Sequence, residues 1–204
     1  MKDYQEVVWA IVGFPLAALC SVLVMVGWQP RLLGHEDFLG STVFGVLIAV
    51  CFSIVGRVSS IWKAAVFVVI SAIAAYFAFF AAAISHDYIF QRLHPGLDLK
   101  PELFVSGFVG TFLVLAASRS LFYPRPSPGS TLLKSFLWSF VGGLLGVIGS
   151  LTEALFTPIR MRLAPLRSDL DVSIIFVWQI GMGFVLASMH LIETRSERIN
   201  GRPS

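Results

Sequence analysis

Residues 61–85 read IWKAAVFVVISAIAAYFAFFAAAIS, and this stretch decides the fold class of the chain. Its only charge is Lys63, near the start, and the rest is aliphatic, aromatic or small. An α-helix rises 1.5 Å per residue, so about 20 apolar residues cross a hydrocarbon layer roughly 30 Å thick. The stretch therefore predicts a transmembrane helix.

Five further stretches have the same apolar character. They predict spanning helices over residues 7–28, 38–55, 103–122, 132–156 and 172–192. The fourth helix of the resulting six carries Arg119 in its last turn, and the fifth contains Lys134 near its start and Glu153 near its end. The sequence thus predicts an all-α, polytopic integral membrane protein, a bundle of about six transmembrane helices forming a single domain over residues 1–204.

The overall composition agrees with a protein surrounded by lipid. Hydrophobic residues make up 56% of the chain and charged residues 13%, against about 25% charged in a typical globular protein. A soluble fold of this size has too much surface to hide so much apolar area. The net charge is +3, but the basic residues are scattered and do not alternate with aromatics as a nucleic-acid site requires. We expect the lipid bilayer as a partner and no nucleic acid.

The loop charges predict the orientation in the membrane. Cytoplasmic loops collect Lys and Arg, and one face of the predicted bundle holds nine of these residues against six on the other. The nine are Lys2, Arg57, Lys63, Arg119, Arg125, Lys134, Arg195, Arg198 and Arg202. This count predicts a plasma (inner) membrane protein with both termini in the cytoplasm, although Arg160, Arg162 and Arg167 on the other face argue the opposite way.

Glu153 is the candidate site residue inside the predicted membrane layer. At 1.5 Å per residue it lies roughly 10 Å from the centre of the fifth helix. An unpaired carboxylate at that depth is unfavourable, so it should face the bundle interior and find a donor or remain protonated. Gln179 on the sixth helix and Arg160 are within reach, which suggests a proton or transport site. The favoured alternative is that the helix ends a turn earlier and Glu153 forms a salt bridge at the interface.

Three histidines form a second candidate site. His35, His86 and His94 fall in the first and third loops, together with Asp87. Imidazole and carboxylate are ordinary zinc ligands, and a catalytic zinc site uses three protein ligands around an open position. The spacing matches no ligand pattern such as H-E-x-x-H, so polar loop residues are the simpler interpretation. His190, near the inner end of the sixth helix, is expected to point to the headgroups, and no cofactor is predicted.

Small residues form stripes on two of the predicted helices. Gly142 and Gly146 make a GxxxG on the fifth helix, where the absence of side chains lets helix backbones approach closely. A similar stripe on the third helix consists of Ser71, Ala75, Ala78 and Ala82. Packing within the bundle is the favoured interpretation, and contact with another membrane protein or a second copy of the chain is the alternative.

Pro15 lies in the middle of the first predicted helix. Its ring clashes with the carbonyl group of Ile11 and removes one backbone hydrogen bond. We therefore expect a kink in this helix.

Three classes of function remain open from the sequence. The first is a non-enzymatic membrane component, either a subunit or an accessory of an assembly, and this class is favoured. The second is a small transporter or channel built around Glu153 and Gln179. The third is a membrane-bound enzyme with a metal site on the non-cytoplasmic face.

Overall fold

The computed structural model describes residues 2–27, 36–86, 101–123, 128–151 and 172–199, and all regular structure in these ranges is helical. The elements are α1 (Lys2–Val8), η1 (Trp9–Gly13), α2 (Phe14–Gly27), α3 (Glu36–Ile54), α4 (Ile61–Ser85), α6 (Pro101–Phe122), α7 (Pro128–Leu151) and α9 (Val172–Ile199). Because α1, η1 and α2 follow one another without a break, these elements make six helical segments. The predicted all-α class is confirmed, and the number of segments matches the prediction.

The helix bounds differ from the predicted spans at several ends, since the first segment begins at Lys2 and α7 begins at Pro128. α4 begins and ends at the predicted residues, whereas α9 continues beyond residue 192 to Ile199. The described part of α7 ends at Leu151, so the last turn predicted for the fifth helix, with Glu153, lies outside the described residues. The extension of α9 matters because its last two turns carry acidic groups that contact other parts of the bundle.

Local sequence signals explain where several helices begin and end. Pro101 and Pro128 are the first residues of α6 and α7, where the missing N–H of proline has no helical partner to lose. Ser60 caps α4 by accepting a hydrogen bond from the backbone N–H of Trp62 (3.3 Å). After α3, Gly56 adopts φ +73° and donates to the Ser53 carbonyl group (3.0 Å).

The first helical segment contains a π-helical turn just before Pro15. This turn, η1, widens the helix over Trp9–Gly13, where the proline ring would otherwise meet the carbonyl group of Ile11. Gly183 of α9 packs against the same place, because a Cβ there would lie 2.7 Å from the Phe14 carbonyl oxygen and 2.8 Å from the Pro15 Cα. The proline-containing turn is therefore a contact point between the first and last helices.

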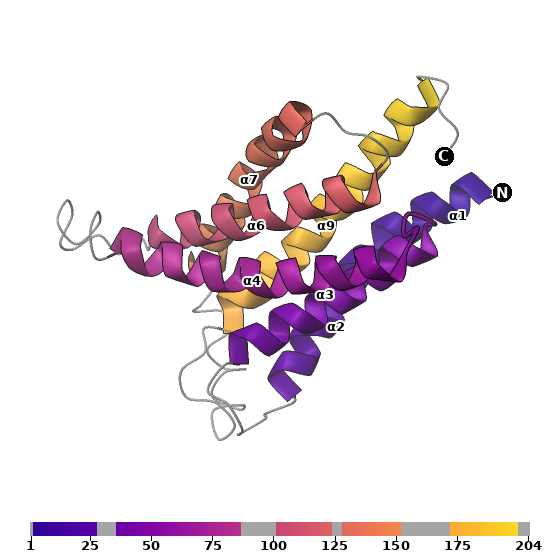
Figure 1. The fold of residues 1–204 in the computed structure, drawn as a ribbon. Helices are drawn as coiled ribbons and strands as arrows, with labels where there is room; N and C mark the ends of the chain where they lie inside the picture. The colour runs from indigo at the N-terminus through magenta and orange to yellow at the C-terminus, as the bar shows by residue number, and fades with distance from the viewer. Residues whose placement is uncertain (1, 28–35, 87–100, 124–127, 152–171, 200–204) are drawn as a thin grey trace.

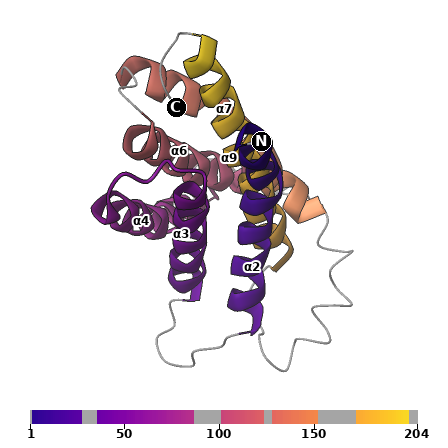
Figure 2. The same cartoon turned by 90° about the vertical axis from the view of Figure 1, so that its right-hand side faces the viewer.

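The helices pack in a closed ring. Each segment contacts the next along the chain, in the order α2, α3, α4, α6, α7 and α9, and α9 returns to contact α2. Figures 1 and 2 show this arrangement, with both chain termini at the same end of the bundle. The ring brings residues from the two ends of the sequence together.

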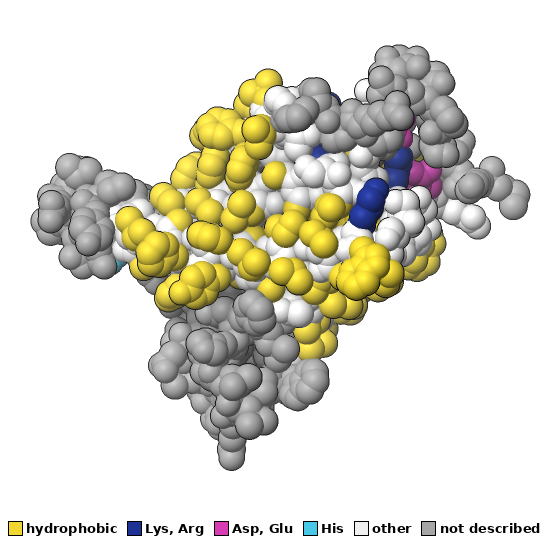
Figure 3. Space-filling model, viewed as in Figure 1, with side chains coloured by type: hydrophobic (Ala, Val, Ile, Leu, Met, Phe, Trp, Pro, Cys, Tyr) yellow, Lys and Arg dark blue, Asp and Glu magenta, His cyan; other side chains and the backbone are white. Residues whose placement is uncertain are grey.

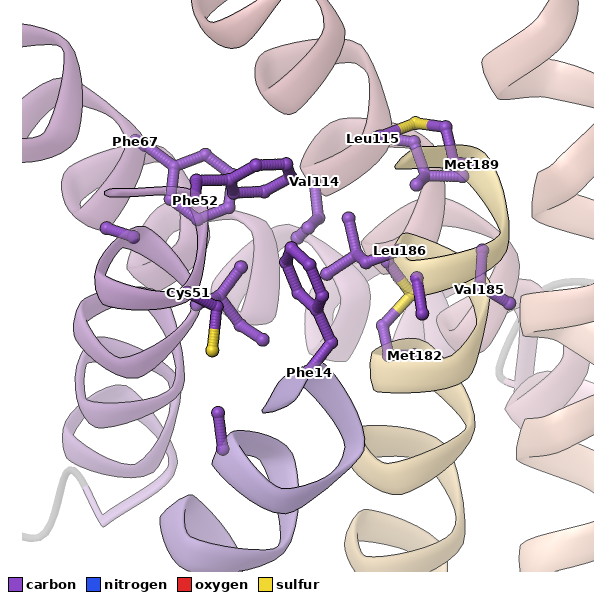
Figure 4. Packing of buried hydrophobic residues seen from close by; sticks show 14 of the residues in the cluster. Phe14, Cys51, Phe52, Phe67, Val114, Leu115, Met182, Val185, Leu186 and Met189 are labelled. Atoms are coloured by element: carbon purple, nitrogen blue, oxygen red, sulfur yellow. The ribbon is translucent and has the colours of Figure 1, made fainter. Parts of the chain in front are cut away.

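Aromatic side chains fill the centre of the ring. The ring centroids of Phe14 and Phe52 lie 4.8 Å apart, and those of Phe52 and Phe122 lie 4.6 Å apart. Phe67 lies 5.1 Å from Phe122 by the same measure. These four side chains join α2, α3, α4 and α6, and Figure 4 shows Phe14 pointing toward Leu186 of α9 and toward Phe52. Such edge and tilted contacts add to the burial energy of the rings.

Glycines set the close packing of α6 and α7. A Cβ on Gly107 would overlap the backbone carbonyl group of Gly142, and one on Gly146 would overlap that of Leu103. A Cβ on Gly142 would collide with the side chain of Thr111. The GxxxG of α7 therefore lies against α6 in this structure, where backbones touch without intervening side chains.

The distribution of polarity is inverted relative to a soluble protein. Polar side chains are buried on α2, α4, α6, α7 and α9. Large apolar side chains are exposed along α2, α3, α4 and α7. Figure 3 shows apolar side chains covering much of one face, with basic and acidic groups gathered near the end that holds the termini. Among the residues that the structure describes, four helices are long and apolar enough to cross a membrane: Gln5–Val24, Ile61–Ser85, Glu102–Phe122 and Gly129–Gly149. These helices indicate a membrane location.

Candidate functional site

Most residues of the two predicted sites lie outside the described part of the chain. This applies to Glu153, His35, Asp87 and His94. Gln179, the expected partner of Glu153, is buried, and its side-chain oxygen lies 2.6 Å from the hydroxyl group of Ser21 on α2. Gln179 thus links the first and last helices, and a role beside Glu153 stays a prediction.

His86 is the member of the predicted metal site that the structure describes. Its Nδ1 lies 3.5 Å from Oε1 of Glu102, which joins the end of α4 to the first turn of α6. Within the described ranges, no group of three or more His, Cys, Asp or Glu side chains is placed to hold a metal ion. The described geometry gives His86 a contact between helices, and the metal site stays a prediction.

A different set of polar residues comes together at the end of the bundle that holds the termini. We call it the terminal cluster. It consists of Glu6, Arg57, Arg119, Tyr123, Lys134, His190, Glu193, Thr194 and Glu197. These residues come from α1, the turn after α3, the end of α6, α7 and α9. The cluster therefore joins all segments of the ring except α4.

The first part of the cluster is centred on Glu193. Oε1 of this carboxylate accepts hydrogen bonds from Nη1 of Arg119 and from Nζ of Lys134 (3.0 Å). The Arg119 side chain is only 4% exposed, whereas that of Lys134 is 45% exposed. Burial of Glu193 opposes ionisation, but the hydrogen bonds and charges of the two bases outweigh it and lower the pKa of this carboxyl group.

The second part is centred on Arg57, which Gly56 positions. The N–H of Arg57 donates to the Phe52 carbonyl group (2.8 Å), and this bond together with the left-handed Gly56 closes a Schellman motif at the end of α3. The guanidinium group then reaches α9, where Nη2 donates to Oγ1 of Thr194 (2.7 Å) and Nη1 lies 2.8 Å from Oε2 of Glu197. The loop arginine is thereby turned into the bundle.

The third part is a chain of three side chains through His190. This imidazole is fully buried. Its Nε2 lies 3.1 Å from Oε1 of Glu6, and its Nδ1 lies 3.0 Å from the hydroxyl group of Tyr123. A carboxylate only accepts hydrogen bonds, so Nε2 carries a proton, and in the neutral imidazole Nδ1 accepts from the phenol. The expectation that His190 points to the headgroups is wrong, because α9 turns this side chain toward α1 and α6.

Tyr123 connects this chain to the arginine. Cζ of Arg57 lies 5.2 Å from the centre of the tyrosine ring, within the range of a cation–π contact. Burial raises the pKa of the Tyr123 hydroxyl group well above its usual value, and the nearby Arg57 only partly opposes this. The phenol therefore stays protonated and donates to His190.

The charges of the terminal cluster balance. Three carboxylates, those of Glu6, Glu193 and Glu197, face three bases, those of Arg57, Arg119 and Lys134. With a neutral imidazole, the sum is zero. A balanced set is the arrangement in which buried charges are tolerated.

A hollow adjoins the cluster between α1 and the end of α3. Its volume is about 380 Å³. It is lined by Gln5, Glu6, Trp9, Ile54, Val55, Gly56 and Arg57. Two of these residues, Glu6 and Arg57, also belong to the terminal cluster, so one wall carries a carboxylate and the other a guanidinium group.

The terminal cluster was not predicted from the sequence. The basic residues served only to predict orientation, and Glu193 and Glu197 were not singled out. One signal was present, because residues 190, 193, 194 and 197 recur at the spacing that places side chains on one face of a helix. The partners on the other helices follow no sequence spacing.

Comparisons of the chain with models of protein families, with curated proteins and with solved structures find no match. The function proposed below therefore follows from the geometry of the chain itself.

Proposed function

We propose that this protein is a non-enzymatic component of a membrane, either a subunit or an accessory of a larger assembly. In this proposal it spans the plasma membrane six times, with α3 and α9 crossing beside the four long apolar helices. Both termini, and with them the terminal cluster, lie on the cytoplasmic side, which agrees with the excess of Lys and Arg at that face.

The proposal rests on one observation: the charged groups of the terminal cluster contact one another across different elements of the bundle. Arg119 and Lys134 both bind Glu193, and Arg57 binds Thr194 and lies against Glu197. Groups that an enzyme or transporter would turn toward a substrate here hold helices to one another. This use of charge suits a protein whose task is to keep a fixed shape in the bilayer.

The outer surface suits contact with lipid or with another membrane protein. α4 exposes a run of aromatic side chains, Tyr76, Phe77, Phe79 and Phe80, on the outside of the ring. In water such a patch would be an aggregation hazard. In a membrane it offers a broad apolar face for a neighbouring helix.

A second candidate function is a small proton-coupled transporter. It is favoured by one observation, the chain from Glu6 through His190 to Tyr123 beside the hollow. Linked carboxylate and imidazole groups are the parts from which proton relays in membrane proteins are built. The predicted acid Glu153 would belong to the same function.

Site-specific photo-crosslinking in native membranes tests the main proposal. A photoreactive phenylalanine analogue placed at Tyr76 or Phe79, both exposed, should give a protein adduct of one defined mass. The same analogue at Phe67, which is fully buried, serves as the control and should give none. Adducts to lipid alone from every exposed position would contradict the role as a subunit.

Proteoliposomes distinguish the second candidate. Vesicles that contain a pH-sensitive dye should show no proton flux above that of empty vesicles if the protein is a structural component. Flux that disappears in Glu6→Gln while the protein stays folded would favour the transporter instead.

Labelling of a single introduced cysteine tests the proposed orientation. Ser59 is exposed in the turn between α3 and α4, so Ser59→Cys, with Cys20 and Cys51 replaced by Ser, should react with an impermeant maleimide only from the cytoplasmic side. Labelling of intact cells from outside would contradict the proposed orientation and place this turn on the non-cytoplasmic side.

A further inference from the structure

We propose that the hollow between α1 and the end of α3 binds the headgroup of a zwitterionic phospholipid, with the ammonium group at Glu6 and the phosphate at Arg57. The inference rests on the membrane location proposed above, but not on the role as a subunit. It assigns a ligand to a site that lies at the edge of the terminal cluster.

The size and lining of the hollow fit such a headgroup. Its volume of about 380 Å³ lies within the range of roughly 300–1,000 Å³ that is typical of small-molecule sites. Glu6 stands on the wall formed by α1, and Arg57 stands on the wall formed by the turn after α3. A ligand that carries a positive and a negative group a few bonds apart matches two walls of opposite charge.

Both charged groups are held in place by the cluster behind them. His190 holds Glu6 through Oε1, and Thr194 and Glu197 hold Arg57. A carboxylate has about four lone-pair sites, and a guanidinium group has five N–H donors. Because the contacts with His190, Thr194 and Glu197 already orient both groups, little conformational entropy is lost on binding.

Trp9 adds a feature specific to a lipid headgroup. Its side chain is 49% exposed on the wall formed by the first helix. Indole rings favour the headgroup layer of a bilayer, and their faces attract ammonium groups through cation–π contacts. The ring thus lies where it can cover the cationic end of the ligand.

The surface next to the hollow favours a lipid over a free zwitterion. Along the first helix, Val12 and Leu16 follow Trp9 at helical spacing and are exposed. On α3, Val50 and Val46 precede Ile54 at four-residue intervals and are also exposed. These two apolar strips lead from the hollow toward the centre of the predicted membrane layer. They offer an acyl chain a surface that a water-borne molecule would not use.

Native mass spectrometry of the full-length protein in detergent tests the proposal. The protein is incubated with equal amounts of phosphatidylethanolamine and phosphatidylglycerol that carry the same acyl chains. We expect one phosphatidylethanolamine to be retained in preference to phosphatidylglycerol. Trp9→Ala should abolish this preference, whereas Trp62→Ala should keep it, because Trp62 is 77% exposed and does not line the hollow.

A second variant tests the ammonium subsite. Glu6→Gln removes the negative charge but keeps a side-chain oxygen that accepts from His190. The preference for phosphatidylethanolamine should fall by about tenfold or more, because the ammonium group loses its opposite charge. Circular dichroism of each variant verifies that the helices are intact.

Three results would overturn the proposal. The first is equal retention of both lipids by the unmodified protein, and the second is an unchanged preference in folded Trp9→Ala. The third is binding of soluble glycerophosphoethanolamine as tight as that of the diacyl lipid, which would make the ligand a free zwitterion. Failure here leaves the protein in the membrane fraction with its crosslinks at Tyr76, so it is distinguishable from failure of the proposed role as a subunit.

Discussion

The substitution Glu193→Gln tests whether the terminal cluster holds the bundle together. In the folded protein, Oε1 of Glu193 accepts hydrogen bonds from Arg119 and Lys134. A glutamine keeps the shape of the side chain but removes the negative charge. The guanidinium group of Arg119, already buried with its Nε unpaired among the described residues, is then left without its opposite charge.

The two bases contribute unequally to the expected effect. Breaking a buried ion pair by removal of one partner costs roughly 3–5 kcal/mol, because the remaining charge is uncompensated. The Arg119 contact belongs to this class, since its side chain is 4% exposed. The Lys134 contact is half exposed, and surface pairs contribute about 0–1 kcal/mol. We therefore expect Glu193→Gln to lower the free energy of unfolding by about 3 kcal/mol, nearly all of it through Arg119.

Equilibrium unfolding in mixed micelles measures this change. Increasing amounts of sodium dodecyl sulfate unfold the protein, and helix content or tryptophan fluorescence follows the transition. Arg195→Gln serves as the control, because Arg195 lies on the same helix and is exposed. Its effect should stay within about 0.5 kcal/mol.

The double variant Arg119→Leu with Glu193→Leu completes the test. Replacement of both members of a buried pair by apolar residues is often neutral or stabilising. The double variant should therefore be more stable than Glu193→Gln alone. If the free energies of unfolding of Glu193→Gln and the unmodified protein differed by less than about 0.5 kcal/mol, the cluster would not hold the helices together. That result would refute the prediction.

Three further outcomes are expected in the same unfolding assay. Gly56→Ala should lower the free energy of unfolding by about 1–2 kcal/mol, because an alanine at φ +73° is strained although no atom lies near its Cβ. Gly129 is equally open but lies in the first turn of α7, so Gly129→Ala should leave the free energy of unfolding unchanged. Gly107→Ala should cost about 1–3 kcal/mol or more, since its Cβ would overlap the carbonyl group of Gly142 and push α6 from α7. Stability should also fall on acidification. The pKa of Glu193 is lowered below 4.5 in the folded protein, so its contribution is present above that pH and is lost as the pH falls through the folded value. The same acid titration of Glu193→Gln should lack this component.

The amount that sequence could predict differs between the fold and the site. Periodic, uninterrupted apolar runs are local properties, so six helices and the exact bounds of α4 could be predicted from them. The extension of α9 to Ile199 could not, because its last two turns are charged. These two turns are helical in the structure, where Glu193, Thr194 and Glu197 bind partners on other elements.

The sequence by itself predicted the membrane location and determined the class of fold. Apolar runs long enough to cross hydrocarbon specify helices, since a chain in lipid has to satisfy its backbone hydrogen bonds internally. Which polar groups meet was decided only by the tertiary structure. Glu6 and His190 are at opposite ends of the chain, and they lie 3.1 Å apart because α9 closes the ring against the first helix. That closure depends on shape, such as Gly183 fitting against Pro15, and such a fit between distant segments leaves no local pattern in the sequence.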